Sequence, residues 1–223
     1  MITHSESRSV RSLRPILVIL GWMAFAIAAG YYLVQAIEMR FLTPGQMGSS
    51  LWNRQAWFYL HLGFALPSLL IGPFQFSARL RFAKSGLHRR LGQNYVICAT
   101  VSALSALTLA ITSEYPMDRP ALTLLAALWL FFTLSGYVCA RRRDFTAHRL
   151  FMIRSYAAVI AFIVLRLFVE APIGRLLSFI TNPDALEAVE TWMAVAVMVL
   201  GTELVFSWIP QMRGRTVIPA RSP

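Results

Sequence analysis

Six long blocks of apolar residues alternate with short polar segments along the 223-residue chain. They cover residues 15–37, 56–76, 95–112, 121–140, 150–169 and 189–208. The apolar residues run together without a polar face at helical or strand period, so a soluble domain does not fit them. A helix of about 20 residues rises about 30 Å, enough to cross the hydrocarbon core of a bilayer. The pattern predicts an all-α polytopic membrane protein, a bundle of six transmembrane helices between tails at 1–14 and 209–223.

Basic residues fall mostly on one side of these predicted spans. Fifteen of the 21 Lys and Arg residues lie in the two tails and in the second-to-third and fourth-to-fifth loops, and four lie in the other three loops. Cytoplasmic loops of membrane proteins are enriched in Lys and Arg, so both termini are predicted to be cytoplasmic. Trp52, Trp57 and Trp192 then fall at the outer interface and Trp208 at the inner one, as in an aromatic belt.

Composition agrees with a membrane protein and argues against a nucleic-acid-binding one. Hydrophobic residues make up 57% of the chain and charged residues 14%, and the net charge of +11 is concentrated between apolar blocks. The predicted partners are therefore the lipid bilayer and, at the basic cytoplasmic loops, anionic lipid headgroups. The first block also fits a signal peptide, but it continues well past its small residues, which favours a retained anchor. The two cysteines, Cys98 and Cys139, imply no disulfide framework.

Four charged residues stand out inside the predicted spans or at their ends, because a charge within the bilayer costs about 2.5–3.5 kcal/mol on insertion scales and therefore needs a partner. Arg154 in the fifth span and Glu203 in the sixth lie at a similar depth near the inner side. Arg166 and Glu170 lie near the outer end of the fifth span, four residues apart, and so face each other on a helix. The depths predict an Arg154–Glu203 pair between helices and an Arg166–Glu170 pair approached by His61.

Three histidines are candidates for chemistry. His61 lies near the outer end of the second span. Its predicted role there is that of a cofactor or metal ligand, a proton carrier, or a polar residue hydrogen-bonded to a neighbouring helix. His88 and His148 open the third and fifth spans at the inner side, each followed by an arginine, so they match in depth. A b-type haem between these two histidines, a zinc or copper site that adds Cys98 and Cys139, or contact with lipid headgroups all fit that position.

The second span carries its own irregularity. Pro67 and Pro73 each remove a backbone hydrogen bond, and carbonyls freed in a bilayer must find another donor or line a polar cavity. The kink is therefore either a ligand pocket or gate, or a packing feature.

Several short motifs occur in a fixed order. They are His61 with Phe64-Ala65, Gly72-Pro73-x-Gln75-Phe76, His88-Arg89-x-Leu91-Gly92-x-x-Tyr95, and His148-Arg149-x-x-Met152-Ile153-Arg154-Ser155-Tyr156-Ala157 followed by Leu165-Arg166. Over residues 57–170 the chain resembles the DUF2306 family (domain of unknown function) of predicted bacterial membrane proteins. The resemblance implies a multi-pass protein of the bacterial inner membrane. It implies no established activity.

The residues and the resemblance together predict an inner-membrane protein of unassigned activity. Its predicted polar interior has an outer layer of His61, Arg166 and Glu170, and an inner layer that consists of His88, His148, Arg154 and Glu203. A haem- or quinone-linked redox role ranks first. A proton-coupled transporter, with the kinked second span as its gate, and a non-catalytic accessory subunit with a membrane partner are the alternatives.

Overall fold

The computed structural model describes residues 54–170, 177 and 179–212, together with seven helical residues between 21 and 34. Side chains are not described at 162 and 166–170. The chain divides into two units, Met1–Gly48 and Ser49–Pro223. Most of the predicted first span, the tail at 1–14, residues 213–223 of the second tail, and residues 171–176 and 178 lie outside the described residues.

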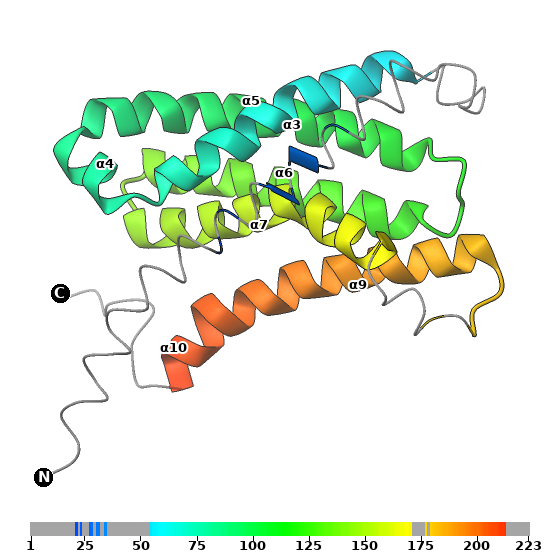
Figure 1. Cartoon of the computed structure of the whole chain (residues 1–223). Coiled ribbons are helices and arrows are strands. Elements are labelled where there is room, and N and C mark those ends of the chain that lie inside the picture. Colours follow the sequence, from blue (N-terminus) through cyan, green and yellow to red (C-terminus); the bar gives the residue numbers. More distant parts are fainter. Residues whose placement is uncertain are drawn as a thin grey trace, which may run out of the picture. The chain divides into compact units, whose positions relative to one another are not determined.

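Every regular element of the described residues is helical (Figure 1). The helices are α3 (Gln55–Gln75), α4 (Ala78–Ala83), α5 (Ser85–Ile111), α6 (Arg119–Arg141), α7 (Phe145–Glu170) and α9 (Pro183–Glu203), and a π-helical segment, Leu204–Trp208, joins α9 to α10 (Ile209–Met212). Four helical stretches are long and apolar enough to cross a membrane: α3, α5, α6 and the continuous run Pro183–Met212. The α7 helix coincides with the predicted fifth span.

Each long helix packs on its neighbour in sequence. The α5 helix packs on α3 and α6, α6 packs on α7, and α9 runs along α7 (Figure 1). The core contains Tyr95, Trp129, Met152 and Tyr156, and buried alanines such as Ala99 let the helices approach closely. Large apolar side chains cover the outside of the bundle instead, among them Leu70, Phe74, Ile97, Phe131 and Val197. An apolar exterior is what contact with lipid requires.

The first basic loop is more helical than the sequence pattern predicted. The α3 helix ends at Gln75, and Ser77 caps the start of α4, where its hydroxyl accepts a hydrogen bond from the Leu80 amide at 3.3 Å. The α5 helix then begins at Ser85, ten residues before the predicted third span, because the segment contains no proline and is rich in Leu and Arg. His88 therefore lies in the first turn of a long helix.

The second basic loop is reduced to a three-residue turn, Arg142–Asp144. Arg143 has a φ of 62°. Its amide donates to the Ala140 carbonyl and the Asp144 amide to the Cys139 carbonyl, which is the Schellman pattern at a helix C-terminus. The Asp144 side chain then accepts from the Ala147 amide at 3.0 Å and caps the start of α7. The turn sets His148 one turn into α7, opposite the end of α6.

Candidate functional site

A fully buried network of hydroxyl groups joins three helices at the centre of the bundle. The Tyr95 hydroxyl on α5 lies 2.9 Å from the Ser155 hydroxyl on α7, which lies 2.7 Å from the Thr133 hydroxyl on α6. The Tyr95, Ser155 and Thr133 side chains are between 0% and 1% exposed. Thr133 also donates to the carbonyl of Trp129. Buried hydroxyls that satisfy each other fix the relative rotation of these helices, because any slip leaves them unpaired.

Tyr156 closes the bundle between α7 and α3. Its hydroxyl donates to the Leu69 carbonyl at 3.2 Å. That carbonyl is the one that Pro73, four residues later, leaves without its helical donor. Gly72 makes the contact possible, because a Cβ there would fall inside the Tyr156 ring. The Phe76 ring adds an aromatic contact at 5.7 Å. Pro73 therefore has a packing role, and the carbonyl that it frees needs no polar cavity.

His61 is bonded to the neighbouring helix. Its Nδ1 lies 3.0 Å from the Ser102 carbonyl on α5, and the Ser102 hydroxyl donates to the His61 carbonyl at 2.9 Å. The imidazole also meets the Trp129 ring edge to face, at 6.2 Å between centroids. The sequence left three roles open for His61. These contacts fit the role of a polar residue that is hydrogen-bonded to a neighbouring helix. The predicted approach of His61 to Arg166 and Glu170 stays a prediction, because the side chains of those two residues lie outside the described part of the chain.

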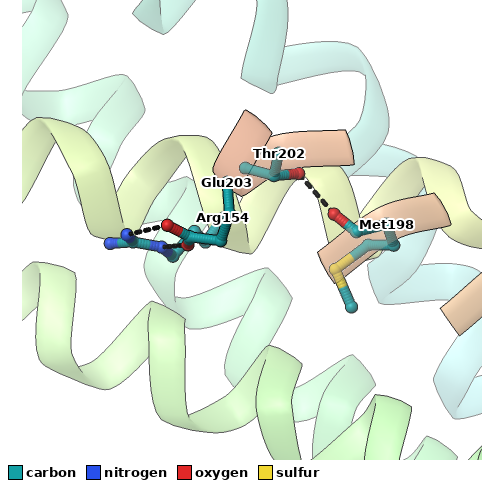
Figure 2. Close-up of polar contacts among 4 residues, drawn as sticks. All are labelled: Arg154, Met198, Thr202 and Glu203. Carbon is teal, nitrogen blue, oxygen red and sulfur yellow. Dashed lines mark hydrogen bonds and ion pairs between the residues drawn. The ribbon is translucent and has the colours of Figure 1, made fainter. Parts of the chain in front are cut away.

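The predicted ion pair between Arg154 and Glu203 is confirmed (Figure 2). Nε of Arg154 donates to Oε1 of Glu203 at 2.5 Å and Nη2 donates to Oε2 at 3.0 Å, so the pair is bidentate. The side chains are 20% and 26% exposed. Thr202, which directly precedes Glu203, donates to the Met198 carbonyl one turn earlier, and the π-helical segment begins immediately after Glu203. The pair is the main polar link between α7 and α9 among the described residues.

His88 and His148 lie near each other at the end of the bundle that carries the two basic loops, as their matching depth predicted. They lie close enough for their charges to interact, and Arg81 on α4 also acts on His88. Nδ1 of His148 lies 2.8 Å from the Gly136 carbonyl on α6. A carbonyl only accepts, so Nδ1 carries the hydrogen and Nε2 of a neutral ring is left with its lone pair. Nδ1 of His88 is buried and has no hydrogen-bond partner among the described residues.

Gln75 is a polar residue of this region that the sequence reasoning did not select. Its Nε2 is buried without a hydrogen-bond partner among the described residues. The carboxamide packs against Gly92 on α5, where a Cβ would lie only 3.2 Å from Oε1 of Gln75. Gly92 is one helical turn from His88, on the same face of α5. The only signal for Gln75 was its place in the motif Gly72-Pro73-x-Gln75, since its own neighbours in sequence are apolar.

A second missed group lies at the opposite end of α6. Asp118 precedes the helix and is 4% exposed. Burial raises the pKa of its carboxyl above the usual range, and a hydrogen bond with the Thr191 side chain opposes that shift. Its Oδ1 has no hydrogen-bond partner among the described residues. No sequence pattern distinguishes Asp118, because it lies in a short polar turn where an acidic residue is ordinary.

The proposed zinc or copper site gains no support from the described residues, which contain no group of three or more His, Cys, Asp and Glu placed to hold a metal ion. Cys98 and Cys139 are free thiols.

Long apolar helices with an apolar exterior and a hydrogen-bonded polar interior define a class, the integral membrane proteins. Within that class, residues 58–206 match the model of the family described as predicted membrane protein DUF2306, and the chain belongs to that family. No curated protein matches the chain, and no solved structure does.

Proposed function

We propose that the chain crosses the inner membrane of a bacterial cell six times, with both termini in the cytoplasm. The charge distribution supports this orientation, because cytoplasmic loops are enriched in Lys and Arg and eight exposed basic residues lie in or beside the α3–α5 and α6–α7 connections: Arg79, Lys84, Arg89, Arg90, Arg141, Arg142, Arg143 and Arg149. Phe82 and Phe145 are exposed beside them. Cationic and aromatic side chains at one level suit a layer of anionic phospholipid headgroups.

Reporter fusions test the orientation. A reporter active only in the cytoplasm, fused after Lys84, after Asp144 or at the C-terminus, is expected to give signal in all three. The same reporter after Gly48 or Pro183 is expected to be silent. A reversed pattern in either set overturns the six-span topology.

We further propose that the His88–His148 pair binds a b-type haem, which gives the protein a one-electron redox function. The observation that carries this proposal is the pair itself: two histidines from α5 and α7 are close enough for their charges to interact, and the Nδ1–H of His148 is fixed on a backbone carbonyl. Histidines that bind a metal through Nε2 usually donate Nδ1–H to such an acceptor, which orients the ring. Helical bundles are established hosts for haem held between histidines of facing helices.

The number of available ligands favours haem over zinc. A structural zinc site takes four protein ligands, and the described residues bring only two histidines together here. A haem iron already has four porphyrin nitrogens and takes two axial ligands from the protein. His148 fits this role with its anchored Nδ1. The buried Nδ1 of His88 fits it once a carboxylate or water supplies the missing acceptor.

The surrounding residues would orient the two ligands. The Tyr95–Ser155–Thr133 network fixes α5, α6 and α7 against one another about two turns from the histidines. The Schellman turn and the Asp144 cap hold the start of α7 in place. Arg81 supplies positive charge beside His88. When bound, the haem would supply the electron transfer. These residues would hold the imidazole rings of His88 and His148 in place and keep the positive charge of Arg81 beside His88.

Absorption spectroscopy of the purified protein tests the haem proposal. A haem with two histidine ligands is expected to give a Soret band in the oxidised protein and sharp, split visible bands in the reduced protein. His88→Ala and His148→Ala are each expected to abolish this spectrum. His61→Ala is the matched control and is expected to retain it, because His61 is bonded to Ser102 at a different depth. A preparation that contains no haem and binds none on titration with haemin overturns the proposal.

A further inference from the structure

Two buried nitrogen atoms at the inner end of the bundle lack hydrogen-bond partners among the described residues. One is Nδ1 of His88 and the other is Nε2 of Gln75. They belong to different helices, α5 and α3. Gly92 on α5 lies one helical turn from His88, and the Gln75 carboxamide packs against Gly92. A buried polar atom without a partner is costly, so each such atom in a native protein requires an explanation.

The chemistry of Gln75 specifies what would satisfy it. Nε2 of an amide donates two hydrogen bonds and accepts none, so its missing partner is an acceptor. The fixed charge nearby is positive, because the Arg81 guanidinium acts on His88. An anionic acceptor suits such surroundings better than a neutral one. Among common ligands, the acceptor group indicated is a carboxylate.

We propose that Gln75 donates a hydrogen bond from Nε2 to a carboxylate of the ligand that His88 and His148 hold. If that ligand is haem, the carboxylate is a propionate at the edge of the macrocycle. This inference rests on the haem proposal and adds to it a residue that positions the ligand and selects for its acidic side chains. The absence of a Cβ at Gly92 lets the carboxamide lie in this place.

The dissociation of haem tests the role of Gln75. Gln75→Met has nearly the shape of glutamine but cannot donate, and Gln75→Glu places a negative charge against the carboxylate. The measurement is the rate at which the intact, haem-loaded protein in mild detergent transfers haem to excess apomyoglobin. Gln93→Leu is the matched control, because Gln93 follows Gly92 on α5 and is exposed.

We expect Gln75→Met to release haem about tenfold faster than the unaltered protein, which corresponds to about 1.4 kcal/mol. Gln75→Glu is expected to release it faster still, and Gln93→Leu at the unaltered rate. Loading with iron octaethylporphyrin, which has no propionates, should remove the difference between Gln75→Met and the unaltered protein. The thermal stability of haem-free Gln75→Met should not fall, because the substitution removes an unpaired buried donor.

Three results overturn the inference: haem release from Gln75→Met at the rate of the Gln93→Leu control, a difference that persists with the propionate-free porphyrin, or a haem-free Gln75→Met that unfolds well below the unaltered protein. The last result would assign Gln75 to packing. These failures are distinct from failure of the haem proposal, in which the unaltered protein binds no haem.

Discussion

Breaking the Arg154–Glu203 ion pair is expected to loosen α9 from α7. In Arg154→Gln or Glu203→Gln one charge is lost and the other stays at the helix interface without its bidentate partner. Removing one partner of a fully buried pair costs about 3–5 kcal/mol, whereas exposed pairs contribute about 0–1 kcal/mol. The two side chains are 20% and 26% exposed, so a loss of about 2–4 kcal/mol is expected from each single change.

Thermal unfolding in mild detergent, followed by tryptophan fluorescence, measures this loss. For a chain of this length about 1 kcal/mol lowers the midpoint by about 3 °C, so each single variant should unfold about 6–12 °C lower. In the double variant Arg154→Gln/Glu203→Gln neither charge is left unpaired, and part of the loss should return as a coupling of about 1–3 kcal/mol. Arg149→Gln, an exposed arginine of the same helix, is the control and should change the midpoint little.

The result that refutes this reasoning is additivity. If the double variant loses as much as the two single variants together, no coupling exists between the side chains. Arg154 would then be stabilised mainly by other contacts, such as the Phe151 ring at 5.7 Å from its guanidinium carbon.

Two further predictions concern the contact between Tyr156 and α3 and the buried carboxyl group of Asp118. Tyr156→Phe leaves the Leu69 carbonyl without a donor and should lower the free energy of unfolding by about 1–3 kcal/mol. Gly72→Ala should lower it at least as much, because the added methyl group overlaps the Tyr156 ring. The same unfolding assay measures both losses, and an unchanged midpoint in Gly72→Ala would contradict the contact. Asp118→Asn should raise the midpoint at pH 7. The raised pKa of Asp118 means that the folded state holds this proton more tightly than the unfolded state does, so stability is lost as pH rises from about 4 through the raised value. The gain from Asp118→Asn should therefore disappear below about pH 4, and a gain that persists there would contradict the assignment.

The sequence by itself determined the features that depend on position along a helix. Hydropathy located the long helices, since lipid requires an unbroken apolar run, and four of the described helical stretches are long and apolar enough to cross a membrane. Depth along the spans paired Arg154 with Glu203 and matched His88 with His148. Met152, Ser155 and Val159 lie three and four residues apart, a spacing that puts them on one face of a helix, and all three are buried in α7.

Only the tertiary structure decided which helix faces which, and how closely. Tyr156 reaches the Leu69 carbonyl because α3 meets α7 at Gly72, and no local pattern specifies that meeting. Gln75 and Asp118 lie among apolar neighbours or in a turn, so their burial depends on Gly92 and Thr191 from other helices. Hydropathy and depth act along the membrane normal. The polar contacts of the core depend instead on the rotation and separation of helices in the membrane plane, which side-chain packing sets.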